Sequence, residues 1–128
     1  MASIFSMIVD GAIPSHKVWE DENHYAFLDI NPWVVGHTLV IPKHEVDYLF
    51  DIDDDAYMAL NLAAKRVAEI LQDKLGCARV CTMVIGYEVP HAHIHLLPTN
   101  TMGDIIVPGS MPSVKVPDLA ELAEQLRS

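Results

Sequence analysis

The pentapeptide His91-Ala92-His93-Ile94-His95 alternates imidazole side chains with apolar ones. Neighbouring side chains of a β-strand point to opposite faces, so a strand here would place all three imidazoles on one face. Imidazoles two residues apart would have Cα atoms about 7 Å apart. The chain has seven histidines in 128 residues, and three of them lie in this segment. Such crowding favours a functional cluster over a solvated strand face, which Thr, Lys or Glu would serve equally well.

Two kinds of chemistry suit these three residues, called the triad below. Imidazoles at alternate positions of a strand can chelate Zn²⁺ at about 2.0 Å, with a third histidine completing the site. Alternatively, one neutral imidazole attacks phosphorus while its neighbours position the phosphate and move protons. Close imidazoles suppress each other's protonation, which keeps a nucleophile free near neutral pH. Spacing alone does not separate a zinc site made of His91, His93 and His95 from covalent catalysis.

The segments around the triad predict an α+β domain with an antiparallel sheet. Apolar residues three and four apart predict helices, and short β-branched or aromatic runs predict strands. The predicted helices span 3–9, 53–75 and 118–127, and the predicted strands span 17–20, 25–30, 37–41, 78–85 and 91–97. The long helix begins with the acids Asp53–Asp55 and ends at Gly76, both of which favour helix termini. Pro98 is expected to end the last strand.

Length and composition limit the class of protein. A chain of 128 residues with 51% hydrophobic residues fits one compact domain. Eighteen acidic against eight basic residues give a formal net charge of −10, which argues against nucleic-acid binding. No stretch approaches the ~20 uninterrupted apolar residues that cross a bilayer, so no membrane partner is expected. Cys77 and Cys81 lack CxxC spacing and follow no secretory leader, so we expect a soluble cytoplasmic protein.

The segment Gly86–Pro98 resembles the signature of the histidine triad (HIT) family, His-x-His-x-His followed by two apolar residues. Four further blocks resemble the family's N-terminal half in order and spacing, at residues 3–14, 20–21, 26–32 and 36–43. The match covers residues 3–98 and is nearest to the Hint-like branch of nucleotidyl hydrolases and transferases. It implies one HIT domain over residues 1–128, with a sheet of about five strands, one long helix and a divergent tail at 99–128.

The resemblance implies hydrolysis or transfer at the α-phosphate of a purine nucleoside phosphoramidate or similar nucleotide, through a nucleotidyl-histidine intermediate. His93 matches the nucleophile, and His91 and His95 match histidines that orient it and bind phosphate oxygens. His37 matches a supporting histidine, and Asp29 matches a carboxylate that accepts hydrogen bonds from the ribose hydroxyls. The matched positions that bind the rest of the nucleotide are Phe5, Ile8, Phe27, Ile30 and Leu39 around the purine, and Gly86 and Val89 in the phosphate-side loop.

The chain departs from the family pattern in the loop before the triad. Glu88 stands where the family has a hydroxyl that can donate a proton to the leaving group, so Glu88 is a candidate catalytic acid. Thr99 replaces an arginine, which argues against a long polyphosphate substrate. Relatives pair as homodimers through the long helix and an edge strand, and no cofactor is required. The alternative function is a nucleotide- or zinc-binding protein of low activity with the triad as ligands. The remaining histidines match no functional position and are expected to be solvated: His16, His24 and His44.

Overall fold

The computed structural model describes residues 2–128. The helices are α1 (Ile4–Val9), α2 (Asp54–Leu75) and α3 (Leu119–Arg127). The strands are β1 (Lys17–Glu20), β2 (His24–Leu28), β3 (Thr38–Pro42), β4 (Arg79–Met83) and β5 (Ile94–Thr99). Two short 3-10 helices, η1 (Leu49–Asp51) and η2 (Met102–Asp104), lie in connecting segments. The α+β order of helices and strands is the one predicted from the sequence.

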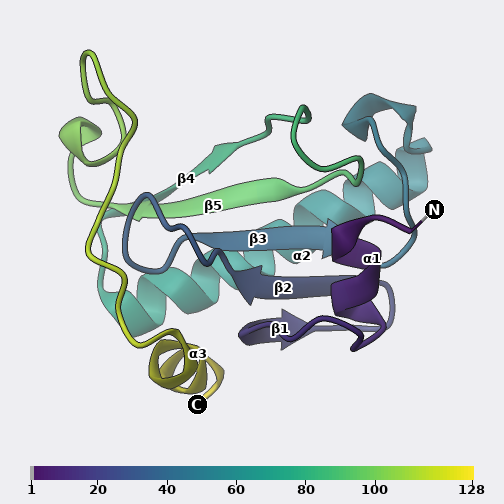
Figure 1. The fold of residues 1–128 in the computed structure, drawn as a ribbon, viewed down its shortest axis with the longest axis horizontal. Coiled ribbons are helices and arrows are strands. Elements are labelled where there is room, and N and C mark those ends of the chain that lie inside the picture. Colours follow the sequence, from purple (N-terminus) through teal and green to yellow (C-terminus); the bar gives the residue numbers. More distant parts are fainter. Residues whose placement is uncertain (1) are drawn as a thin grey trace.

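The five strands form one sheet in the order β1-β2-β3-β5-β4, and every neighbouring pair is antiparallel. In Figure 1, α2 runs behind this sheet and the short α1 lies in front of the ends of β2 and β3. The segment after β5 descends along one side of the molecule to α3. This is the five-stranded antiparallel sheet with one long helix that the resemblance implies.

Alternation of side chains along the strands divides the apolar core into two clusters. Ala26, Leu28 and Val40 point toward α2 and belong to the larger cluster. The residues of the opposite face pack with α1 in a smaller cluster of Phe5, Tyr25, Phe27, Leu39 and Ile41. Each large apolar side chain buried in this way contributes about 1.5–3 kcal/mol. Both faces of the sheet are therefore apolar where a helix covers them.

Strand register links the smaller cluster to the triad. Phe27 pairs with Leu39 across β2 and β3, and Leu39 pairs with His95 across β3 and β5. Directly opposite residues of paired strands share a face of the sheet. The three side chains therefore form a row on the sheet face that is turned away from α2. A site that includes the His95 imidazole must lie on this face.

The triad does not form a continuous strand. β5 begins at Ile94, so His95 alone of the three histidines is a strand residue, and His91 and His93 precede it. In that preceding segment, the backbone N–H of Ala92 donates to the carbonyl of Val46 at 2.7 Å. The prediction of a strand over 91–97 is therefore wrong at its start, because this contact replaces ladder pairing with β3.

β5 also continues further than predicted, through Pro98 to Thr99. β3 pairs with β5 only as far as Leu96, so beyond that point β4 is the single strand neighbour. Proline is tolerated where one side of a strand is unpaired, because its missing N–H then removes no ladder hydrogen bond. Pro98 pairs with Val80 instead of ending the strand.

Two further boundaries follow from local hydrogen bonds. β2 ends at Leu28 rather than residue 30, because the Asp29 side chain accepts the backbone N–H of Asn31 at 2.8 Å and forms a turn. α2 has the predicted ends: Asp53 caps its N-terminus, and Gly76 closes its C-terminus at a φ of 65°.

His24 contradicts the expectation that it is solvated. Its side chain is 5% exposed, and Nδ1 lies 3.0 Å from an oxygen of Asp21. The same Asp21 oxygen accepts the backbone N–H of His24 at 2.7 Å, so the histidine closes the turn between β1 and β2. His16 is half-buried and His44 is exposed.

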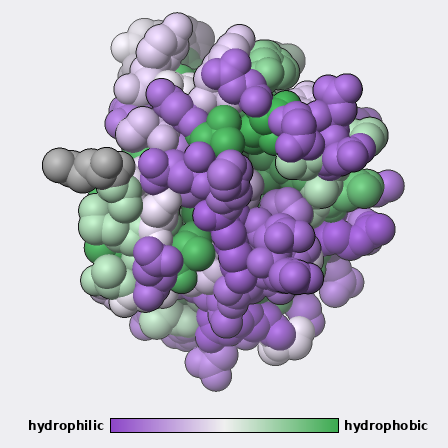
Figure 2. Space-filling model, turned by 90° about the vertical axis from the view of Figure 1, so that its right-hand side faces the viewer, coloured by the Kyte–Doolittle hydropathy of each residue, from purple (hydrophilic) through white to green (hydrophobic). Residues whose placement is uncertain are grey.

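One end of the molecule has a mainly hydrophilic surface. Figure 2 looks onto the end of the molecule that carries the N-terminus, and hydrophilic residues dominate that face with small apolar areas between them. Over residues 2–128, no helix combines the length and the apolar character that crossing a bilayer requires.

Candidate active site

Four imidazoles gather with the Phe5 ring on the sheet face opposite α2. The ring centroids of His93 and His95 are 5.0 Å apart, those of His37 and His95 are 5.1 Å apart, and the edge-on pair Phe5 and His93 is also 5.1 Å apart. His37, His91 and His93 are each at most 5% exposed. The rings thus come from α1 (Phe5), the residue before β3 (His37), the segment before β5 (His91 and His93) and β5 itself (His95).

The hydrogen bonds of His93 leave one ring nitrogen free. Its Nδ1 lies 2.8 Å from the backbone carbonyl oxygen of His91. A carbonyl oxygen only accepts, so Nδ1 carries the proton and Nε2 of the neutral ring holds a lone pair. A neutral imidazole with a free, oriented lone pair is a nucleophile for phosphorus.

The orientation of His95 is fixed through His37 by a backbone amide. The N–H of Trp33 donates to His37 Nδ1 at 3.1 Å, so the proton of a neutral His37 sits on Nε2. That Nε2–H donates to His95 Nδ1 at 2.8 Å, which leaves Nε2–H of His95 as a donor. The Trp33 ring stacks on His95 with an interplanar angle of 7° and a centroid distance of 5.7 Å. His95 can therefore offer a hydrogen bond to a phosphate oxygen without being charged.

His91 uses both ring nitrogens within the protein. Nε2 donates to the carbonyl oxygen of Pro42 at 2.7 Å, and Nδ1 accepts from the hydroxyl of Ser3 at 2.8 Å. No ring nitrogen is left for a phosphate oxygen. The resemblance implies that His91 orients the nucleophile and binds a phosphate oxygen. The geometry allows the first role, because the His91 carbonyl accepts a hydrogen bond from His93, but leaves no ring nitrogen for the second.

Burial keeps these imidazoles neutral. Burial lowers the pKa of His37 to about 4. The pKa of His95 also falls to about 4, first through burial and then through His37 and His93, while Asp29 opposes the shift. Burial lowers the pKa of His91 as well. Near neutral pH these three imidazoles therefore carry little charge, and a bound anion would meet the N–H of His95 rather than an imidazolium ion there.

Asp29 lies at the edge of the histidine cluster. One carboxylate oxygen is 3.6 Å from His37 Nε2, and the other accepts the N–H of Asn31. The first oxygen keeps free lone pairs, which suits the predicted contact with vicinal hydroxyls. Asp29 lies here because it directly follows Leu28, the last residue of β2.

The predicted purine positions fall into two groups. Phe5, Phe27 and Leu39 are buried in one cluster, with Ile8 and Val89 packed against it. Ile30 is 66% exposed beyond the end of β2 and lies outside that cluster. The structure thus brings four of the five predicted purine positions together, with Val89 of the phosphate-side loop beside them, and leaves Ile30 apart.

The loop that carries Gly86 and Glu88 lies between β4 and the triad. Gly86 and Glu88 are both exposed, and Tyr87 between them is 96% exposed. Val89 is half-buried, and its carbonyl accepts the N–H of His91 at 2.8 Å. The loop is therefore anchored at its triad end, while Glu88 points its carboxylate into solvent.

Sequence reasoning missed several residues that contact the imidazoles, among them Trp33, Ser3 and Glu45. Trp33 had a weak signal, an aromatic residue in a turn four positions before His37. Ser3 and Glu45 had none, because they meet His91 across 88 and 46 positions of chain. Glu45 Oε1 lies 4.0 Å from His91 Nδ1.

Zinc was the alternative expected for the triad, and the described residues bring a different set together. Three potential ligand atoms, one each from Asp29, His37 and His95, lie within 4.8 Å of one another. This spacing is compatible with a metal ion. Ligation through His37 Nε2 would break its hydrogen bond to His95 and move its proton to Nδ1, where it would face the N–H of Trp33. The hydrogen-bonded arrangement therefore fits a metal-free cluster better than a zinc site.

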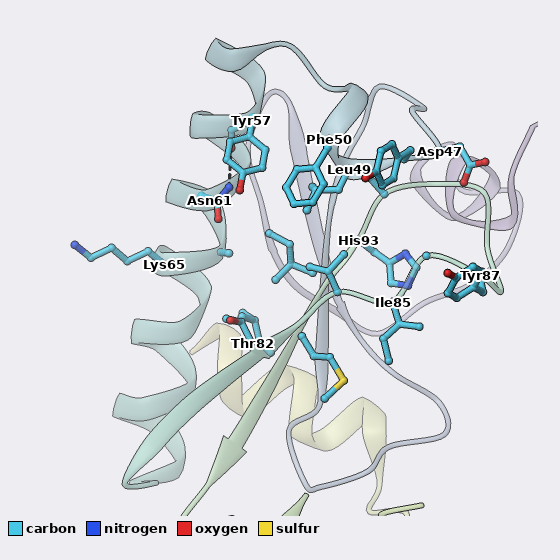
Figure 3. A pocket seen from close by; sticks show the side chains of 18 of the residues that line it. Asp47, Leu49, Phe50, Tyr57, Asn61, Lys65, Thr82, Ile85, Tyr87 and His93 are labelled. Atoms are coloured by element: carbon cyan, nitrogen blue, oxygen red, sulfur yellow. Dashed lines mark hydrogen bonds between the residues drawn. The ribbon is translucent and has the colours of Figure 1, made fainter. Parts of the chain in front are cut away.

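A large apolar pocket of about 750 Å³ lies between α2 and β4. Figure 3 shows Tyr57, Asn61 and Lys65 of α2 on one side, and His93, Ile85 and Tyr87 on the opposite side. Ile94 and Leu96 also line it, and both belong to the cluster that faces α2. The pocket is thus mainly on the other side of the sheet from Phe27 and Leu39.

The chain matches known proteins over most of its length. Residues 10–102 match the HIT domain model. An uncharacterized HIT-like protein of Methanocaldococcus jannaschii is 34% identical over 129 aligned residues, which cover 97% of this chain and 98% of that protein. The adenosine 5'-monophosphoramidase of Saccharomyces cerevisiae is 39% identical over 98 residues, which cover 76% of this chain and 62% of the yeast protein.

The crystal structure of a zinc-bound histidine triad family protein from Mycobacterium smegmatis superposes with a TM-score of 0.82 at 29% identity. The superposition covers 99% of this chain and 91% of that one. Fold, sequence and the clustered imidazoles agree, and the chain belongs to the histidine triad (HIT) family.

Proposed function

We propose that this protein hydrolyses, or transfers a nucleotidyl group from, a purine nucleoside phosphoramidate or a similar nucleotide derivative. The observation that carries the proposal is the free Nε2 lone pair of His93, fixed by the hydrogen bond from Nδ1 to the His91 carbonyl. The yeast relative named a phosphoramidase supports the same reaction class. The net charge of −10 favours a small, singly charged phosphate derivative over a polyphosphate.

The reaction takes place in two displacements at phosphorus. The lone pair of His93 Nε2 bonds to the α-phosphorus, and the P–N bond to the amine breaks with its electron pair leaving on the amine. Water then bonds to phosphorus while the new P–N bond to His93 breaks. This second step returns the lone pair to Nε2 and releases the nucleoside monophosphate, and the proton of the water passes to solvent.

The remaining groups bind and orient the substrate. The Nε2–H of His95 donates to a non-bridging phosphate oxygen, and the carboxylate of Asp29 accepts from the ribose hydroxyls. The purine lies against the apolar cluster that contains Phe5, Phe27 and Leu39. All of these side chains lie on the sheet face turned away from α2, so one nucleotide can reach them together.

Replacing His93 tests this mechanism. The variant His93→Ala is expected to lower turnover of adenosine 5'-phosphoramidate by at least about 1,000-fold, because none of the other three imidazoles of the cluster offers an unpaired lone pair. His16→Ala, half-buried ahead of β1, is the matched control and keeps wild-type turnover. Unchanged release of ammonia in the His93 variant would refute the mechanism.

Glu88 is proposed as the acid that protonates the departing amine. Because the Glu88 carboxylate is exposed, the loop must bring it to the leaving group when substrate binds. Glu88→Gln should slow release of a basic alkylamine and leave release of the weakly basic p-nitroaniline nearly unchanged, since that leaving group needs little protonation. Glu22→Gln, at an exposed turn, is the control. Equal slowing of both substrates would remove Glu88 from this role.

We also propose that two copies pair through α2 and β4. β4 is an edge strand, and Met58, Leu62, Val84 and Ile85 expose apolar side chains on or beside these elements. An exposed edge and an apolar patch together are typical of a homodimer interface. Light scattering should give twice the chain mass, and Leu62→Glu should reduce it to one chain, whereas Val116→Glu in the C-terminal segment should not. A monomeric wild type would refute the pairing.

A further inference from the structure

Ser3, Ser6 and Glu45 form a hydrogen-bonded group that the proposed reaction does not yet use. The Glu45 carboxylate accepts the backbone N–H of Ser3 at 2.7 Å and the hydroxyl of Ser6 at 2.6 Å, through the same oxygen. The Ser3 hydroxyl accepts the N–H of Ser6 at 3.0 Å and caps α1. The group therefore joins the start of α1 to the segment that follows β3.

His91 completes this group. With its oxygen occupied by the Ser6 N–H, the Ser3 hydroxyl directs its proton to His91 Nδ1 at 2.8 Å. The Ser6 oxygen is 3.4 Å from the same nitrogen and commits its own proton to Glu45. His91 is fully buried, and its opposite nitrogen donates to Pro42. The Ser3 hydroxyl also lies 3.4 Å from the Ser6 oxygen, and His91 Nδ1 at 2.8 Å is the nearer acceptor of its proton.

Glu45 is held in its ionised form. Hydrogen bonds from Ser6 and Ser3 lower its pKa to about 2, so the carboxylate remains an acceptor throughout the range in which the protein is folded and assayed. An acceptor is what the group requires, because both of its partners donate. A protonated carboxyl would compete for the Ser6 oxygen and disturb the order of donors.

The group bears on the nucleophile in two ways. His91 supplies the carbonyl that accepts from His93 Nδ1, so the position of the His91 backbone sets the direction of the His93 lone pair. α1 also carries Phe5, whose ring lies edge-on to both His91 and His93 at 5.9 and 5.1 Å. A misplacement of about 1 Å in such a group is enough to slow a reaction markedly.

We propose that Ser3, Ser6 and Glu45 are positioning residues, which hold His91 as its single Nε2–H tautomer and thereby align His93 for attack. This inference rests on the proposed function, in which His93 is the nucleophile. It assigns a role to α1 and Glu45 that neither the triad nor the nucleotide contacts require.

The test compares three variants and one control. Glu45→Ala removes both acceptor contacts, Glu45→Gln keeps an amide oxygen that accepts both, and Ser3→Ala removes the donor to His91. Glu22→Ala, an exposed turn residue, is the control. The readouts are kcat and KM for adenosine 5'-phosphoramidate, together with ring-nitrogen ¹⁵N shifts of His91 measured by NMR.

Glu45→Ala and Ser3→Ala are expected to lower kcat about five-fold and change KM by less than about two-fold. Ser3→Ala removes the hydrogen bond to His91, and Glu45→Ala removes the two contacts that hold Ser3 and Ser6 in place. In both, the His91 Nδ1 signal should move toward that of an unbonded, unprotonated nitrogen. Glu45→Gln should restore both readouts to within about two-fold of wild type.

Wild-type kcat and an unchanged His91 signal in Glu45→Ala and Ser3→Ala would overturn the proposal, even if the melting temperature falls. Glu45→Ala is expected to fold normally because the Glu45 side chain is exposed, so its kcat remains interpretable if Ser3→Ala fails to fold. A wild type that does not turn over the phosphoramidate would instead refute the proposed function. In that case the ¹⁵N signals still decide whether the three residues fix the tautomer of His91.

Discussion

Lowering the pH from 7.5 to 5.5 is expected to destabilise the fold by about 3 kcal/mol through His37 and His95 alone. Both are ordinary histidines in the unfolded chain, where the pKa of the side chain is 6.5, and the pKa of both falls to about 4 in the folded protein. The folded state therefore binds fewer protons than the unfolded state over this range. These two histidines therefore leave the free energy of unfolding unchanged above pH 6.5 and lower it progressively as the pH falls from 6.5 toward 4.

The magnitude follows from the two pKa values of each group. At pH 5.5 an unfolded histidine is mostly protonated, whereas a folded one with a pKa of about 4 is almost entirely neutral. The difference corresponds to about 1 to 2 kcal/mol for each ring, or about 3 kcal/mol for both. His91 acts in the same direction because its pKa is also lowered. Carboxylates change their protonation mainly below this window.

Urea denaturation at pH 7.5, 6.5 and 5.5 measures the free energy of unfolding. His37→Gln and His95→Gln should each reduce the pH dependence by about 1 to 2 kcal/mol, while His44→Gln, which alters an exposed residue, should leave it unchanged. A wild-type free energy that stays constant or rises as the pH falls to 5.5 would refute the reasoning. It would mean that the buried imidazoles gain protons at their usual pH.

Three other changes have defined outcomes. A Cβ at Gly36 would lie 2.5 Å from a Leu75 methyl carbon at a φ of +90°, so Gly36→Ala should lower the urea midpoint clearly, while Gly109→Ala, with open space around it, should lower it much less. Trp33→Ala should lower kcat about five-fold and broaden the His95 ring signals, because the stacked ring is lost; unchanged NMR signals would count against it. Full removal of metal by a chelator, verified by elemental analysis, should leave turnover unchanged. A loss of turnover that zinc restores would contradict a mechanism without metal.

Helix and strand boundaries were predicted well where the local sequence signals were strong. α2 combined helical periodicity with an acidic start and a glycine end, and its boundaries were within one residue of the prediction. The strand over 91–97 was inferred from alternation alone. Alternation does not reveal that Ala92 pairs with Val46, a tertiary contact that holds His91 and His93 outside the sheet.

The sequence and its family resemblance pointed to side chains that the structure gathers together, but not to their hydrogen bonds. The triad and His37 could be picked out from the sequence, yet the His37–His95 contact depends on the register between β3 and β5. Ile30 was grouped with the purine positions because it matches a family position, whereas the turn at Asp29 leaves it 66% exposed. His24 was expected to be solvated, since its hydrogen bond to Asp21 across a turn leaves no mark on composition.

The most direct test of the account is to trap the covalent intermediate. Protein mixed with adenosine 5'-phosphoramidate is quenched in denaturant within milliseconds and digested, and the peptide containing the triad is sequenced by mass spectrometry. The account predicts one adenylyl group on His93, absent from His93→Ala. Steady turnover with no adduct at any quench time, or an adduct on another residue, would contradict it.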